Sequence, residues 1–166
     1  MAATLTWDDV RRLADYRAAR GTAISLYVDL APMDSPTPRD AATRVSALLA
    51  DGHKDGAAQE LSHHEKEALK KDFERIERFF VHEFERDGAH GLAVFCAGLD
   101  GVWRPLSLTE TVPDGIRLGH ELYLAPLVPL VGRGEGALVV VVSREQGRLY
   151  RLRAGRLEEQ IGRAHV

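Results

Sequence analysis

The sequence is short of several features that define particular classes of protein. Its single cysteine, Cys96, allows no disulfide within the chain, and we therefore expect a reducing, cytoplasmic location. Its apolar runs, such as 137–142, are far shorter than the roughly 20 residues that a membrane span needs. The first residues, MAATLTWDDVRR, lack the uninterrupted apolar segment of a secretory signal. These shortages exclude disulfide-stapled scaffolds and predict no contact with a membrane.

The chain also lacks an excess of positive charge, and its charges are unevenly distributed. The chain has 22 basic and 25 acidic residues and a net charge of −3, which argues against binding to nucleic acid through bulk electrostatics. Residues 51–90 have an excess of acidic side chains, whereas residues 144–156 have an excess of arginine. The basic strand patch could face phosphate or form a solvated strand face. It comprises Arg144, Arg148, Arg151 and Arg153.

The N-terminal part of the sequence predicts one helix and one strand. Thr6 and Asp9 have the spacing of a capping box, and apolar residues then recur at helical spacing up to Gly21. From Ile24 to Leu30, apolar residues alternate with Ser, Tyr and Asp. A period of two predicts a strand with one buried face.

The middle of the sequence predicts a helical hairpin with a polar tip. Thr37, followed by proline and then by an acid, predicts a helix start. That helix weakens at an Asp-Gly pair, and we expect residues 51–61 to form a polar connector. Ser62 and Glu65 form a second capping box. A long helix with an aromatic stripe is predicted from there to about Asp87.

Strand patterns dominate the remaining sequence. Residues 91–97 are continuously apolar, which predicts a central strand, and further extended segments are predicted at 102–108 and 121–125. We therefore expect an α+β fold, in which a mixed sheet packs with the long helical hairpin. After residue 136 the pattern changes to two successive hairpins, a β-meander.

These patterns divide the chain into three parts. We expect one domain over residues 1–134 and the truncated start of a second over residues 135–160. A lone meander with unpaired edges is marginally stable, so the second domain is expected to continue beyond this segment. Residues 161–166, IGRAHV, match the translation of a common sequencing-library adapter, and we expect them to be a non-native tail.

Residue groups that would indicate an enzyme are missing from the pattern. The sequence shows no glycine-rich phosphate loop, zinc-ligand spacing or nucleophile motif. His63 and His64, with His53 nearby, suggest a metal patch, but neighbours on a helix point about 100° apart and do not converge. Cys96 lies in an apolar strand, where a thiol is usually inert. We expect no catalytic residue, metal or cofactor in this segment.

The order of these parts resembles a known family. From residue 6 to residue 159 it is similar to the N-terminal domain and the opening middle-domain strands of the archaeo-eukaryotic peptide chain release factors and their Pelota-like relatives, and within that family to a bacterial branch. The segments that carry the resemblance are ISLYVDL, RVSALLAD, GLAVFCAG, WRPLSL, ELYLAPLVPLV and ALVVVVSREQGRLYRL.

The resemblance implies a protein that enters the ribosomal A site in place of tRNA. In the family, the tip between the two long helices reaches toward the decoding centre, and that tip corresponds here to residues 51–66. The residues implied as rRNA donors are His53, Lys54, His63, His64 and Lys66. Release factors carry an Asn-Ile-Lys-Ser motif there and this chain does not, which favours ribosome rescue or hibernation over stop-codon reading. A translational GTPase is a further implied partner, and DNA is not.

Two alternatives remain open at this stage. The full-length protein could release peptide or hydrolyse peptidyl-tRNA, a reaction that in the family depends on a Gly-Gly-Gln loop, which would lie downstream of this segment. Alternatively, the chain could be a stress-linked protein-interaction module without RNA contact, which its net acidic charge would suit.

Overall fold

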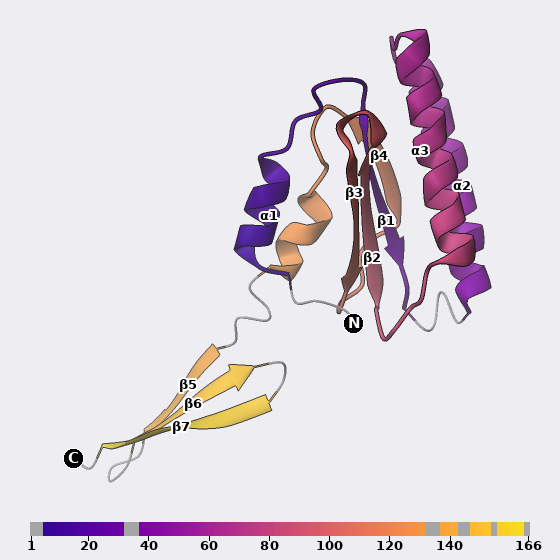
Figure 1. Ribbon diagram of the computed structural model, residues 1–166. Helices are drawn as coiled ribbons and strands as arrows, with labels where there is room; N and C mark the ends of the chain where they lie inside the picture. Colours follow the sequence, from indigo (N-terminus) through magenta and orange to yellow (C-terminus); the bar gives the residue numbers. More distant parts are fainter. Residues whose placement is uncertain (1–4, 32–36, 132–136, 143–146, 154–155, 165–166) are drawn as a thin grey trace.

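The structure is a computed structural model that describes residues 5–31, 37–131, 137–142, 147–153 and 156–164. It contains a four-stranded sheet with helices on both faces and a second sheet of three strands (Figure 1). The helices are α1 (Trp7–Ala14), α2 (Pro38–Ala58), α3 (His63–His82) and the short 3-10 segments η1 (Gly98–Asp100) and η2 (Ala125–Leu130). The strands are β1 (Ala23–Asp29), β2 (Gly91–Ala97), β3 (Val102–Leu108), β4 (Gly115–Gly119), β5 (Ala137–Val142), β6 (Gly147–Arg153) and β7 (Arg156–Ala164).

The first sheet has the strand order β3-β2-β1-β4, with β2 next to the centre as predicted. All three of its pairings are antiparallel; for example, Leu26 pairs with Val94 on β2 and with Ile116 on β4. The α+β class is confirmed, but the expectation of a mixed sheet is wrong. The physical reason lies in the connection, because two antiparallel helices return the chain to the end of the sheet from which it left, so β2 must run against β1.

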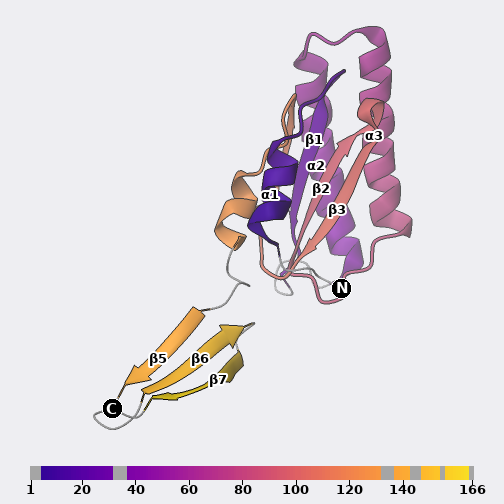
Figure 2. The same cartoon turned by 60° about the vertical axis from the view of Figure 1, so that its left-hand side comes forward.

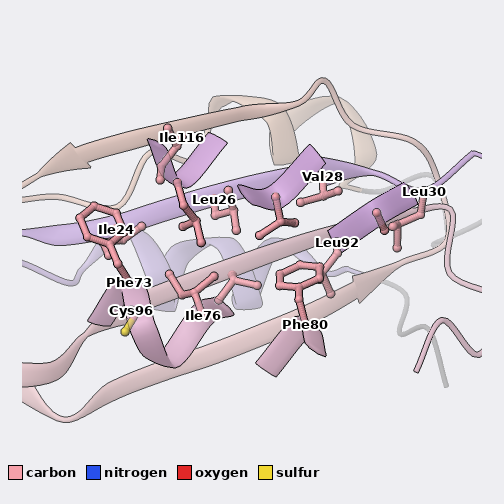
Figure 3. Packing of buried hydrophobic residues seen from close by; sticks show 14 of the residues in the cluster. Ile24, Leu26, Val28, Leu30, Phe73, Ile76, Phe80, Leu92, Cys96 and Ile116 are labelled. Atoms are coloured by element: carbon pink, nitrogen blue, oxygen red, sulfur yellow. The ribbon is translucent and has the colours of Figure 1, made fainter. Parts of the chain in front are cut away.

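Helices α2 and α3 cover one face of this sheet (Figure 1). Their contact with it is a core of buried apolar side chains, in which Leu26 and Val28 of β1 meet Ile76 and Phe80 of α3 (Figure 3). Each of these four side chains is at most 6% exposed. Removing this much apolar surface from water is the main force that holds the hairpin on the sheet.

The opposite face of the sheet is covered by α1 and η2 (Figure 2). Tyr27 points to this side, is 1% exposed and packs edge-to-face on Phe95, with ring centroids 6.0 Å apart. The prediction that β1 buries one face is therefore wrong, because both faces are covered and even Ser25 is buried. Alternation of polar and apolar residues along a strand does not reveal a second covering layer.

The observed helix boundaries differ from the predicted ones. The capping box of Thr6 and Asp9 starts α1 as expected, but the helix ends at Ala14 instead of Gly21. Helix α2 does not stop at residue 51; it continues to Ala58, and only residues 59–62 connect it to α3. Helix α3 starts after its Ser62 cap as predicted and ends at His82. Helix α2 is therefore longer and the connector shorter than the sequence suggested, whereas α3 ends before the predicted end at about Asp87.

Two glycines within α2, in the stretch where the helix was expected to end, are in close contact with neighbouring elements. A Cβ atom on Gly52 would lie 2.7 Å from Cδ1 of Ile116 and 3.0 Å from Cε1 of Phe73, and one on Gly56 would lie 2.8 Å from Cδ2 of Leu69. These distances are too short for a real Cβ, so the glycines serve close packing inside a helix instead of ending it.

The C-terminal part of the chain confirms one prediction and corrects another. Strands β5, β6 and β7 pair in that order as an antiparallel meander, as expected. The segment expected to be extended at 121–125 contributes only an isolated bridge between Arg17 and Glu121, and the fourth strand of the first sheet is β4 instead. Residues 161–164 belong to β7. The domain boundaries and the non-native tail stay predictions.

No helix in the described part of the chain combines the length and the apolar character that crossing a bilayer requires.

Candidate nucleic-acid interface on the helical hairpin

The end of the α2–α3 hairpin extends past the end of the four-stranded sheet (Figures 1 and 2). Its connector is held by the capping box at the start of α3. Glu65 accepts hydrogen bonds from the backbone N–H of Ser62 at 2.8 Å and from its hydroxyl at 2.7 Å, and the Ser62 hydroxyl accepts the Glu65 N–H at 3.3 Å. Such reciprocal bonds satisfy donors that a helix start leaves unpaired.

The same carboxylate joins the hairpin to the sheet. Glu65 also accepts a 3.0 Å hydrogen bond from the backbone N–H of Gly21, which precedes β1. These bonds stabilise the ionised form, with those from Ser62 having the largest effect, and they lower the pKa of Glu65 below its usual value of 4.5. The hairpin end is thus tied to the segment before β1 by a hydrogen bond that favours the charged carboxylate.

The five donor residues predicted for the tip do not share one loop. His53 and Lys54 lie within α2, whereas His63, His64 and Lys66 lie in the first turns of α3. All five are exposed. Lys54 makes a 3.0 Å ion pair with Asp51 on its own helix. The prediction that residues 51–61 form a polar connector is wrong, because α2 stays helical to Ala58 and packs closely on β4 and α3 through Gly52 and Gly56.

Two of the predicted donors meet across the hairpin. His53 of α2 and Lys66 of α3 line one open groove of about 430 Å³ between the two helices, which we call the lysine groove. Its other lining residues are Gly56, Ala57, Glu67, Leu69, Lys70 and Phe73. The ring of His53 lies 4.1 Å from that of Phe73, centroid to centroid, while His53 remains exposed. The groove therefore has an apolar floor, an accessible ring and lysines at its rim.

Lys70 also lines this groove, although it was not among the predicted donors. Lys70 follows Lys66 by four residues, so the two side chains lie on the same side of α3, one helical turn apart. Neither ammonium group has an ion pair or side-chain hydrogen bond among the described residues. The i, i+4 spacing was visible in the sequence, but Lys70 lay outside the range assigned to the tip.

A second groove, of about 350 Å³, lies on the other side of α2, and we call it the acidic groove. Its lining includes the carboxylates of Asp51, Asp55 and Asp114, together with Arg117 and Tyr123. Asp114 forms an ion pair with Arg44, and the Arg117 guanidinium lies 5.9 Å from the centre of the Tyr123 ring. One helix therefore separates a groove lined by two lysines from a groove lined by three aspartates.

The basic strand patch lies partly within β6 and partly outside the described residues. Arg144 lies outside the described residues. Arg148, Arg151 and Arg153 belong to β6, where Arg151 pairs in register with Glu158 of β7. A phosphate-binding role for this patch stays a prediction.

The cysteine has a structural environment, as predicted. Cys96 lies in β2 and is fully buried. Burial first, and the neighbouring Asp72 second, raise the pKa of its thiol, so the sulfur stays protonated and poorly nucleophilic. Asp72 itself accepts a 2.8 Å hydrogen bond from the backbone N–H of Gly98. This cluster anchors α3 to η1.

Solved structures of other proteins share this fold. The archaeal translation termination factor aRF1 superposes with a TM-score of 0.55 at 18% sequence identity, over 94% of this chain and 42% of its own. A structure described as an archaeal protein gives a TM-score of 0.54 at 18% identity, over 94% and 43%. This chain thus spans less than half the length of either structure, and the likeness establishes the fold. Neither a protein-family model nor a curated protein sequence matches the chain.

Proposed function

We propose that this chain is part of a ribosome-associated translation factor of the release-factor and Pelota type, and that it binds the A site in ribosome rescue or hibernation. The observation that carries the proposal is the fold shared with the archaeal termination factor aRF1 over 94% of the chain. In this proposal, residues 1–134 correspond to the N-terminal domain and residues 135–160 to the start of the middle domain.

The shape of the hairpin supports this proposal. Its end extends past the sheet (Figure 2), and the connector is fixed by caps at Ser62 and by the bond from Gly21 to Glu65. An exposed projection with a hydrogen-bonded connector suits a probe that enters a narrow site, because bonds made before binding reduce the conformational entropy lost on binding.

The connector also supports rescue or hibernation over codon-specific termination. Residues 59–62 are Gln, Glu, Leu and Ser, so the Asn-Ile-Lys-Ser motif of release factors is not present there. Membership of the bacterial branch, a GTPase partner, a cytoplasmic location and any peptide-releasing activity of the full-length protein are further predictions of the same proposal.

Cosedimentation with ribosomes tests the proposal. The full-length protein should pellet with ribosomes through a sucrose cushion when cells are stressed or when ribosomes stall, and a tRNA bound in the A site should compete with it. Protein that stays in the supernatant during both growth and stress would contradict the proposal. Peptide release that depends on a stop codon would overturn the preference for rescue or hibernation.

A further inference from the structure

We infer that the lysine groove is a binding site for single-stranded RNA, with phosphates held by Lys66 and Lys70 and a base stacked on His53. The inference rests on the proposed function for its class of partner and deepens it by moving the RNA contact from the connector to the groove between the helices. It assigns a role to Lys70, which lay outside the predicted tip.

The first support is the chemistry of the rim. Lys66 and Lys70 are both exposed and lie one turn apart on the same side of α3. Within the part of the chain that the structure describes, neither ammonium has an acidic partner. Lysines without partners can release counterions from a phosphate backbone on binding, because they need not first give up an ion pair.

The second support is the ring of His53. It lines the groove opposite the lysines, and Phe73 supports it at 4.1 Å between ring centroids. Proteins that bind single strands combine a positively charged groove with aromatic rings on which bases stack, and histidine serves as such a platform in RNA recognition. The groove volume of about 430 Å³ is within the range of small-ligand sites.

The third support is the contrast across α2. The acidic groove on the other side of the helix carries Asp51, Asp55 and Asp114, of which Asp51 is paired with Lys54 and Asp114 with Arg44. Asp55 has no ion-pair partner among the described residues, and we expect its charge to make this side the less favourable one for phosphate. Glu67 is the carboxylate that lines the lysine groove, so it should oppose binding.

A fluorescent oligouridylate provides the direct test with the full chain. Neutralising the pair in Lys66→Gln/Lys70→Gln should weaken binding about tenfold or more at low salt and reduce the slope of log K against log salt by about 1.4. The matched control is Lys71→Gln, which removes an exposed lysine from the same helix but outside the groove and should change little. Glu67→Gln should tighten binding. Equal loss in the Lys71 variant and the groove variant would overturn the inference.

The stacking role of His53 is tested separately from its packing on Phe73. His53→Ala should weaken oligouridylate binding by about tenfold, whereas His53→Tyr, which keeps an aromatic plane, should restore most of it. Thermal unfolding of both variants shows whether the fold is retained. Loss of binding in both variants with an unchanged melting temperature, or retention in both, would contradict stacking.

The outcomes also separate this inference from the proposed function. If the wild-type protein pellets with ribosomes but the lysine-pair variant pellets equally well, the groove inference fails and the proposed function stands. If the protein binds oligouridylate through the groove but does not pellet with ribosomes, the proposed function fails and the groove inference stands. Tighter binding of a polyglutamate peptide than of oligouridylate would identify an acidic protein partner and overturn the inference.

Discussion

The two halves of the α2–α3 hairpin are packed by different means. The near half is the half away from the connector of residues 59–62. There, large side chains such as Val45, Ile76 and Phe80 fill the space over the sheet. In the far half, next to the connector, α2 has glycine at positions 52 and 56, and the side chains that fill the space come from α3 and β4. The near half is therefore a conventional core, whereas in the far half the backbone of α2 comes into direct contact with its neighbours.

This difference explains how the projecting end can be closely packed with few large side chains on α2. A core of large side chains on both helices would hold them further apart, whereas glycine allows interaxial distances at the short end of the usual range. Because Gly56 and Ala57 are small, the surface above them stays open and forms the lysine groove. Close packing beneath and an open groove above thus have the same cause.

Removing the large partner in the far half should have the largest effect on stability. Phe73 is 2% exposed and contacts the site of Gly52. Phe73→Ala should lower the free energy of unfolding by about 3–5 kcal/mol, because glycine on the other helix offers nothing that can fill the cavity. Urea denaturation of the full chain measures this.

The matched control for this variant lies further along the same helix. Val81 is 60% exposed, and Val81→Ala should change the free energy of unfolding by no more than about 0.5 kcal/mol. A Phe73→Ala variant that unfolds within about 1 kcal/mol of the wild type would mean that the far half contributes little to stability, and the contrast between the halves would fail.

Much of the hairpin could be predicted from the sequence because its starts are local. The caps at Thr37 and Ser62 depend on residues three positions apart, and both were predicted and are confirmed. The continuous apolar run of residues 91–97 likewise predicted a strand inside the sheet, and β2 lies between β3 and β1. The α+β class follows from these elements alone.

What could not be predicted depends on residues far apart in the sequence. Gly52 next to an aspartate indicates a helix end locally, and only the proximity of Ile116 and Phe73 in the fold gives it another role. The lysine groove likewise joins His53 to residues of a different helix. The second buried face of β1 is covered by α1 together with η2, and η2 lies about a hundred residues further along the chain.

Adding bulk to the glycine side should have the next largest effect. Gly52→Val should lower the free energy of unfolding by about 1–3 kcal/mol through overpacking against Ile116 and Phe73. Ala50→Val places the same β-branched residue at an exposed position of α2 and should cost no more than the loss of helix propensity, about 0.7 kcal/mol. Chemical denaturation of the pair separates the two causes, and equal losses would show that Gly52 is not a close contact.

The smallest effect concerns the two capping boxes, one at each end of the hairpin. Asp40 at the start of α2 bonds only to Thr37 among the described residues, whereas Glu65 at the start of α3 also accepts the N–H of Gly21. Both carboxyls have a lowered pKa, chiefly through the hydroxyl of the cap residue. A lowered pKa stabilises the fold at neutral pH, and that stability is lost as pH falls through the folded-state value.

Glu65→Gln should therefore shift the urea midpoint downward at pH 7, and more than Asp40→Asn does. The deficit relative to wild type should shrink at an acidic pH below the lowered pKa of Glu65, where the wild-type carboxyl becomes protonated. An equal deficit at both pH values would show that the shape of the side chain, and not its charge, ties the far end of the hairpin to the sheet.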